Sequence, residues 1–274
     1  MDRAHGQVWS LLSAKKRDLE LEAGAAAHFE DPAYYTQTYA PRRADVAYYR
    51  ALAEERGSVL EQGVGNGRIA LAMAEAGASV VGIDASRPML ADLRARLKAA
   101  APAIRKRVEV HEGDLRTTKL GRKFPLVICP FNTALHLYDR PDVEQWLART
   151  REHLKKRGEL VFDIAMPLPE DLARDPNEAF AIPPFQHPAL GRVKYREHFD
   201  YDRVRQILFV SMFFTPRKAA DEVMTPLAHR QFYPREMEAL LHYNGFEVTA
   251  LYGDFARGPL TQRSDVMVWH ARPR

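Results

Sequence analysis

Cysteine is almost absent from this chain. The 274 residues include one cysteine, Cys129, so no disulfide can form within the chain and no cysteine-rich zinc site can be built. Cys129 ends the apolar run Pro125-Leu126-Val127-Ile128-Cys129, where we expect a small core residue and not a nucleophile. The zinc motif HExxH is also missing, and no metal site is predicted.

Long apolar runs and an excess of one charge are missing as well. No stretch of about 18 apolar residues occurs, and the N-terminus lacks a charged start followed by an apolar signal core. We therefore expect a soluble, cytoplasmic protein. The 40 basic and 36 acidic residues give a formal net charge of +4. A charge so small and so evenly spread argues against a nucleic-acid partner.

The chain does contain enough apolar residues for a large core and one glycine-rich motif. With 46% hydrophobic residues, we expect one domain with an insertion, or two domains. A short apolar strand, residues 58–60, runs toward three glycines at alternating positions: Gly63, Gly65 and Gly67. Glycines let the backbone turn sharply and approach a ligand, and the alanine-rich residues 68–76 favour a helix that Gly77 ends. The motif predicts a cradle for a cofactor.

Predicted strands and helices alternate at short intervals through the first half of the chain. This pattern is typical of a parallel sheet with helices on both faces, and right-handed crossovers then give a doubly wound α/β fold. The predicted strands cover residues 58–60, 78–83, 107–115 with Gly113-Asp114 at its end, 126–130 and 159–165, and the helices cover 45–55, 68–76, 88–100 and 142–154.

The rhythm breaks at Met166. Residues 167–190 hold six prolines and are predicted to form a long loop. Two antiparallel strands are expected next, and then a helix and two last strands: 193–201, 207–214, 233–243, 246–252 and 265–271. At the other end, residues 7–27 are predicted to be helical, and the tyrosine-rich residues 31–43 are predicted to form an irregular packed segment.

Polar residues follow successive predicted strands. Asp84 follows the second strand, Asp114 the third, and Pro130-Phe131-Asn132 the fourth. In an open α/β sheet, ligands bind beyond the carboxyl ends of the strands. These residues and the glycine turn are therefore expected to form one site.

The spacing Glu61-x-Gly63-x-Gly65-x-Gly67 resembles the first motif of class I S-adenosylmethionine (SAM) dependent methyltransferases, with departures at Gln62, Val64 and Asn66. The resemblance implies a Rossmann-like seven-stranded sheet of order 3-2-1-4-5-7-6, with SAM as cofactor and S-adenosylhomocysteine as product. It further implies that Asp84 binds the ribose hydroxyls, that Asp114 binds the adenine amine, and that Glu61 orients the glycine turn. The remaining implied contacts are Ala85, Met89, Leu115, Pro130 and Asn132.

The loop after the fourth strand resembles the Phe-Asn-x-x-x-His-Leu loop of small-molecule members, among them glycine and amino-sugar N-methyltransferases. His136 is therefore the candidate catalytic base or orienting group, because an ordinary imidazole pKa near 6.5 suits proton removal at neutral pH. A buried structural histidine is the alternative. By the same analogy the tyrosine-rich segment is a lid, in which Tyr35 or Tyr39 covers the cofactor and Arg43 pairs with its carboxylate.

The predicted protein transfers a methyl group to nitrogen or oxygen of a small metabolite. Residues 1–44 are assigned to an N-terminal helical lid, residues 45–166 and 228–274 to the SAM-binding domain, and residues 167–227 to an inserted loop and antiparallel strands that cover the substrate or form a homodimer interface. Three alternatives remain open: an NAD-dependent oxidoreductase, since Gly65-x-Gly67-x-x-Ala70 with Asp84 also fits a dinucleotide fingerprint, a nucleic-acid-modifying methyltransferase, and a non-catalytic subunit.

Overall fold

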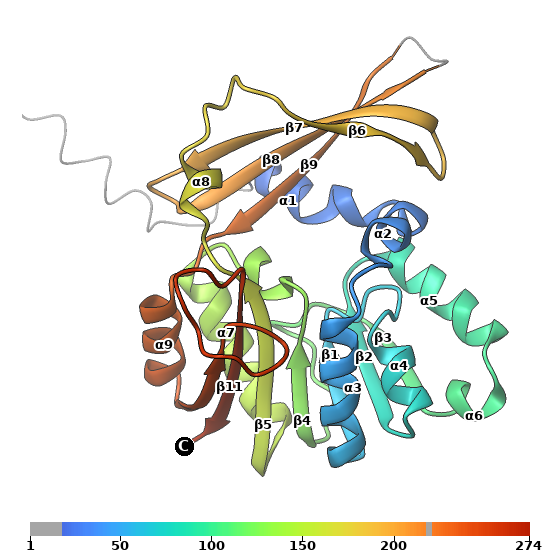
Figure 1. Cartoon of the computed structure of the whole chain (residues 1–274). Coiled ribbons are helices and arrows are strands. Elements are labelled where there is room, and N and C mark those ends of the chain that lie inside the picture. Colours follow the sequence, from blue (N-terminus) through green and yellow to red (C-terminus); the bar gives the residue numbers. More distant parts are fainter. Residues whose placement is uncertain (1–17, 218–220) are drawn as a thin grey trace, which may run out of the picture.

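A seven-stranded sheet forms the centre of the computed structural model, which describes residues 18–217 and 221–274 (Figure 1). The strand order is β10-β11-β5-β4-β1-β2-β3, and β11 runs antiparallel to both of its neighbours. Numbered within this sheet, the order is 3-2-1-4-5-7-6, which confirms the predicted fold. The strands are β1 Ser58–Gln62, β2 Ser79–Asp84, β3 Val108–Glu112, β4 Phe124–Cys129, β5 Leu154–Ala165, β10 Phe246–Tyr252 and β11 Val266–Pro273.

Helices cover both faces of this sheet, because alternate strand residues are apolar toward each side. Val59, Leu126 and Val161 pack with one group of helices, and Leu60, Val127 and Phe162 pack with the other. The first group is α3 Ala44–Arg56, α4 Ala70–Glu75 and α5 Arg87–Ala99, and the second is α7 Arg140–His153 and α9 Pro234–Tyr243. Short helices α6 Pro102–Arg105 and η3 Thr133–His136 complete the layers.

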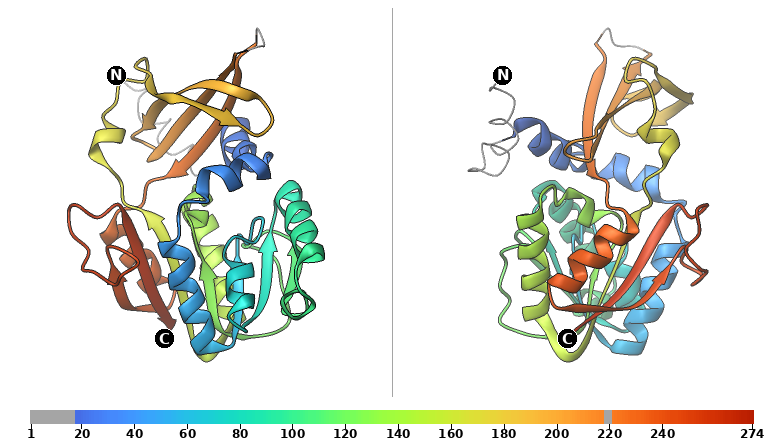
Figure 2. Two further views of the ribbon diagram at one scale, coloured as in Figure 1. Left: turned by 45° about the vertical axis from the view of Figure 1, so that its right-hand side comes forward. Right: turned by 90° about the vertical axis from the view of Figure 1, so that its left-hand side faces the viewer.

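A second sheet lies over the C-terminal ends of the parallel strands (Figures 1 and 2). It is antiparallel, in the order β6 Phe180–His187, β7 Gly191–Asp202, β8 Ile207–Pro216 and β9 Val223–Arg230, and short helix α8 Pro169–Leu172 precedes it. We call these four strands the inserted sheet. The chain enters the inserted sheet after β5 and returns from it to α9.

Two strands of the inserted sheet were not predicted from the sequence. Residues 180–187 were expected to be part of a loop, but β6 pairs with β7 there, and the register shifts between Ile182 and Phe185, where Pro183 and Pro184 lie. β9 contains Pro226. Both are edge strands, where a missing N–H is tolerated, so proline does not exclude a strand as it would in a sheet interior.

The N-terminal region forms helices that lie between the two sheets: α1 Leu19–Ala26, η2 Ala27–Phe29 and α2 Pro32–Tyr39 (Figure 1). The prediction of an irregular segment over residues 31–43 was wrong, because Asp31 caps α2 by accepting a hydrogen bond from the Tyr34 N–H and Pro32 occupies its first turn. Of the helix expected at 7–27, residues 7–17 lie outside the described residues. We call residues 19–39 the lid.

Within the described part of the chain, no helix is both long enough and apolar enough to cross a membrane.

Candidate active site

A cavity of about 320 Å³ lies at the C-terminal ends of the parallel strands, beneath the lid and β9. All of the predicted site residues line it except Arg43 and Gly67. We call it the first cavity. Its lining includes Tyr35, Tyr39, Glu61, Gly63, Gly65, Asp84, Ala85, Met89, Asp114, Leu115, Pro130, Asn132 and His136.

The glycine turn approaches two other parts of the chain too closely for side chains. Gly63 has a φ of +75°, and a Cβ there would lie 2.5 Å from the Thr133 side chain. Gly67 has a φ of +82°, and a Cβ there would lie 2.3 Å from Leu93 of α5. Gly63 therefore lets Thr133 approach the turn where both residues line the cavity, whereas Gly67 allows α5 to pack and does not itself line the cavity.

Asp84 holds the glycine turn as well as lining the cavity. Its Oδ2 accepts a hydrogen bond of 2.7 Å from the Gly65 N–H, and its Oδ1 accepts one of 2.8 Å from the Ser86 N–H. Burial raises the pKa of this carboxyl, although the backbone hydrogen bonds oppose the shift. Sequence reasoning found the residue but missed this contact with the turn.

Glu61 is buried, and its Oε2 has no hydrogen-bond partner among the described residues. Burial raises the pKa of this carboxyl well above its usual range, with Arg68 opposing the shift. We expected Glu61 to orient the turn through backbone hydrogen bonds, but this oxygen makes none. An unpaired buried oxygen beside a cavity fits a hydrogen-bonding cation, and the ammonium group of SAM is one.

Asp114 and Met89 also line the cavity. Arg116 binds both carboxylate oxygens of Asp114, with its Nε 3.0 Å from each, and also pairs with Asp142. Met89 is buried, and its methyl group lies 3.2 Å from where a Cβ of Gly65 would be. Both residues thus line the same cavity as the glycine turn, and their contact with adenine stays a prediction from the resemblance.

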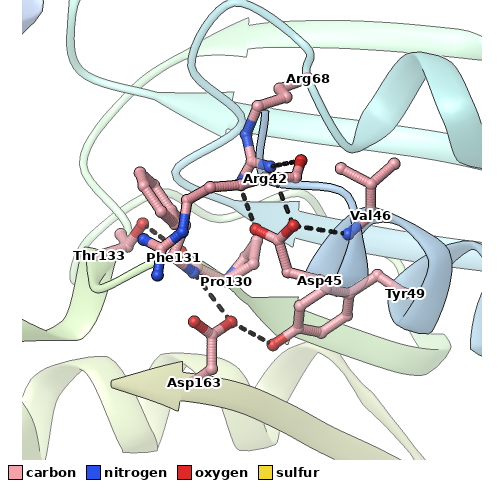
Figure 3. A network of polar contacts seen from close by, with 9 residues as sticks. All are labelled: Arg42, Asp45, Val46, Tyr49, Arg68, Pro130, Phe131, Thr133 and Asp163. Atoms are coloured by element: carbon pink, nitrogen blue, oxygen red, sulfur yellow. Dashed lines mark hydrogen bonds and ion pairs between the residues drawn. The ribbon is translucent and has the colours of Figure 1, made fainter. Parts of the chain in front are cut away.

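The loop after β4 has an unusual backbone that β5 holds in place (Figure 3). Phe131 and Asn132 have φ values of +56° and +63°, a conformation that costs non-glycine residues roughly 1–3 kcal/mol each. Asp163 of β5 accepts hydrogen bonds from the Phe131 N–H at 2.9 Å and the Tyr49 hydroxyl at 2.6 Å. The Ala165 N–H donates to Asn132 Oδ1 at 2.7 Å. Burial raises the pKa of Asp163 to about 6.

Asp163 was not predicted as a site residue from the sequence, although its position in the chain could have indicated it. It is the charged residue within the apolar strand Leu160-Val161-Phe162-Asp163-Ile164, where a buried carboxylate needs partners. A polar residue on the fourth or fifth strand could have been linked to the neighbouring loop on that ground.

Two arginines flank the Phe131 ring, and Arg43 is not one of them. The guanidinium carbons of Arg68 and Arg42 lie 4.6 Å and 5.1 Å from the ring centroid. Arg68 also pairs with Asp45 at 2.5 Å, as Figure 3 shows. Both arginines line the cavity, whereas Arg43 occupies the N-cap of α3 and is exposed. The pairing of Arg43 with the cofactor carboxylate stays a prediction, and the residue that lines the cavity is its neighbour Arg42.

Three histidines from distant parts of the chain meet beside the lid: His28, His136 and His229. We call them the histidine group. The His136 ring lies 5.1 Å from the His229 ring, and the His28 Nε2 lies 2.9 Å from the Tyr39 hydroxyl. Burial lowers the pKa of His28 and of His136 to about 4, and that of His229 well below 6.5. The premise of an ordinary pKa for His136 was wrong, because the imidazole is desolvated and lies near other histidines.

Neither the cysteine thiol nor a metal ligand set is available for chemistry among the described residues. Cys129 is fully buried at the end of β4, and burial raises the pKa of its thiol well above the usual range. The described residues contain no cluster of three or more histidine, cysteine or acidic side chains that could hold a metal ion.

A family model described as a methyltransferase domain matches residues 59–158. The chain is 30% identical over 217 residues to a cypemycin N-terminal methyltransferase from a Streptomyces species, which covers 77% of this chain and 81% of the relative. The CcbJ methyltransferase of Streptomyces caelestis superimposes with a TM-score of 0.72 at 24% identity, over 84% of this chain and 94% of that one. SAM-bound CalS10, an amino pentose methyltransferase from Micromonospora echinaspora, superimposes with a TM-score of 0.61 at 18% identity, over 94% of this chain and 98% of that one.

These matches set aside the dinucleotide interpretation of Gly65-x-Gly67-x-x-Ala70. The chain belongs to the class I SAM-dependent methyltransferases, and its cofactor is SAM.

Proposed function

We propose that the protein transfers the methyl group of SAM to a nitrogen atom of a small molecule. The observation that carries the proposal is that the first cavity joins the glycine turn and Asp84 to the histidine group. Nitrogen is favoured over oxygen because the cypemycin enzyme is named for an N-terminal amine and CalS10 for an amino pentose.

Each part of the cofactor has a proposed partner among the lining residues. Asp84 binds the ribose hydroxyls, and Asp114 with Leu115 and Met89 binds the adenine. The Glu61 oxygen without a partner receives the ammonium group, and Arg42 and Arg68 face the carboxylate. Tyr35 and Tyr39 cover the site from the lid, while Pro130 and Asn132 border the transferable methyl group.

The chemistry that SAM supplies is a methyl group on a positively charged sulfur, which a lone pair displaces in line. An ammonium has no lone pair, so the acceptor nitrogen must be neutral when it attacks. The desolvation that lowers the pKa of His28 and His136 also lowers that of an amine bound beside them. The histidine group therefore favours the neutral form of the amine. The main role of His136 is then to orient this amine, because a neutral amine does not need a strong base to remove a proton before it attacks.

A calorimetric titration with S-adenosylhomocysteine tests the cofactor half of the proposal. Loss of the Asp84→Ala carboxylate removes charge-assisted hydrogen bonds worth roughly 1.5–3 kcal/mol each, so we expect affinity to fall at least about 100-fold. Asp175→Ala, at an exposed aspartate of the link before β6, is the control. If the wild-type chain does not bind, the proposal fails.

Methyl transfer to a panel of amines tests the acceptor half. Release of S-adenosylhomocysteine is measured with amino sugars, with peptides that have a free N-terminus, and with the matching alcohols. We expect turnover of amines, rising with pH as more of the free amine becomes neutral. Turnover of alcohols alone would replace nitrogen by oxygen as the acceptor.

Three predictions from the sequence remain proposals. We propose that residues 45–166 and 228–274 bind the cofactor while residues 1–44 and 167–227 cover the acceptor. A cytoplasmic location is proposed, and so is a homodimer formed through the inserted strands. The apolar run Ile207–Phe214 is part of β8, an interior strand of the inserted sheet, so a dimer would use the faces or the outer edges of that sheet.

A further inference from the structure

A second cavity of about 220 Å³ lies between the lid and the inserted sheet. Its walls come from the lid residues His28, Glu30, Asp31 and Tyr34 and from His187 and Phe214 of β6 and β8. The proposed function does not use this cavity, and none of the residues predicted from the sequence lines it.

Among the described residues, one lines both cavities. His28 lines both of them and is 5% exposed. Its Nε2 is hydrogen-bonded to the Tyr39 hydroxyl, while its Nδ1 is buried and has no hydrogen-bond partner in the part of the chain that the structure describes. A molecule that reacts in the first cavity could therefore extend past His28 into the second.

Aromatic rings form the walls of the second cavity. The rings of Tyr34 and His187 are stacked with centroids 4.6 Å apart, and Phe214 meets them edge-on at 5.2 Å and 5.3 Å. A hydrogen bond connects the lid side of this cavity to the inserted sheet, because Gln37 of the lid donates to the carbonyl of Gln186 in β6 at 2.6 Å. The cavity is thus bordered by a cluster of aromatic rings that contact one another.

The charges around the second cavity are negative. Glu30 and Asp31 line it, and no lysine or arginine is among its described lining residues. Asp31 uses Oδ1 to cap α2 but keeps its charge near His187. Burial lowers the pKa of both His28 and His187, so neither brings a compensating positive charge at neutral pH. Carboxylates beside aromatic faces attract cations.

We propose that the second cavity binds a positively charged nitrogen of the acceptor, distinct from the nitrogen that is methylated. This inference rests on the proposed function. The acceptor is then a molecule with two amine nitrogens: the histidine group takes one in its neutral form, and Glu30 and Asp31 hold the other as a cation. The two environments would thereby select which nitrogen is methylated.

Crystals of the complex with S-adenosylhomocysteine, soaked with three ring compounds of similar size, test the inference. The probes are piperidine, which is a cation at neutral pH, tetrahydropyran, which is neutral, and cyclohexanecarboxylate, which is an anion. We expect density for piperidinium in the second cavity with its nitrogen toward Glu30, and none for the other two. Equal occupancy by tetrahydropyran, occupancy by the anion, or an empty cavity with piperidinium would overturn the inference.

Matched variants extend the test to solution. Binding of piperidinium to the same complex should weaken about fivefold in Glu30→Gln and be unchanged in Glu55→Gln, at an exposed carboxylate of α3. Ala189→Trp, at an exposed lining residue of the β6–β7 turn, should fill the second cavity and abolish binding. Unchanged binding in both Glu30→Gln and Ala189→Trp would refute the assignment.

Different results would refute the proposed function and the inference about the second cavity. Density for S-adenosylhomocysteine in the first cavity, with no cation in the second, would refute this inference alone. Absence of S-adenosylhomocysteine from the first cavity would instead count against the proposed function.

Discussion

The seven-stranded sheet and the inserted sheet contribute to the site in different ways. The strands of the first sheet end in backbone turns and carboxylates, such as the turn at Gly63 and Gly65 and the carboxyl of Asp84. The inserted sheet presents side chains from one face, with His229 in the first cavity and Phe214 in the second. The first mode suits a cofactor of constant shape, and the second suits an acceptor that differs between relatives.

This contrast teaches how each ligand is encoded. The cofactor binds at the C-terminal edge of the seven-stranded sheet. This edge is formed by short segments of sequence, because a strand, the turn after it and the next helix are contiguous in the chain. The acceptor side is an assembly, because His28, His136 and His229 come from the lid, the loop after β4 and β9. Variants in the two regions should therefore have different consequences.

The largest expected contrast is between glycines with the same backbone conformation. Gly63→Ala combines left-handed strain with a 2.5 Å contact to Thr133 and should lower the free energy of unfolding by about 3 kcal/mol and weaken binding of S-adenosylhomocysteine. Gly191→Ala, at the first residue of β7 with a φ of +74°, would place its Cβ no closer than 4.0 Å to any described neighbouring atom. It should cost about 1 kcal/mol and leave cofactor affinity unchanged. Denaturant unfolding and calorimetry measure both, and equal losses would break the comparison.

A smaller effect concerns how the stability of the fold depends on pH through His28, which lines both cavities. The pKa of His28 is lowered from 6.5 to about 4, so the unfolded chain binds a proton at this residue before the folded chain does. Stability from the neutral ring is present above pH 6.5 and is lost as the pH falls toward 4.

When the pH is lowered from about 7 to about 5, the free energy of unfolding of the wild type should fall by about 2 kcal/mol more than that of His28→Gln. Parallel pH profiles for the wild type and His28→Gln would show that burial does not shift this histidine.

The smallest effect distinguishes neighbouring arginines. Arg42→Ala removes a cation that lines the cavity beside Phe131 and should weaken binding of S-adenosylhomocysteine by about 5–10-fold, or about 1 kcal/mol. Arg43→Ala should change it less than about twofold, because this exposed residue does not line the cavity. A reversed order in calorimetry would restore the interpretation made from the sequence.

The sequence predicted the cofactor edge well, because local spacing encodes it. The alternation of elements predicted a parallel sheet covered on both faces, the glycines predicted the turn, and the resemblance carried by the motif at Glu61 implied the strand order. The sequence did not indicate that Arg42 lines the cavity and Arg43 does not, since the turn between α2 and α3 decides which of two adjacent side chains faces the cavity.

The parts that the sequence did not predict depend on contacts between distant residues. β6 and β9 contain prolines that local rules place in loops, and only their position at sheet edges permits pairing. His28 and His229 carry no local motif and acquire their low pKa values from burial in the assembled site. The second cavity likewise exists only once lid and inserted sheet meet.

The fully buried Cys129 has a practical consequence. As the one thiol in the sequence, held without access to solvent at the end of β4, it gives no background in maleimide chemistry on the folded protein. Ala189→Cys would then carry a single fluorophore on the β6–β7 turn, and its emission would follow movement of that turn as ligands bind.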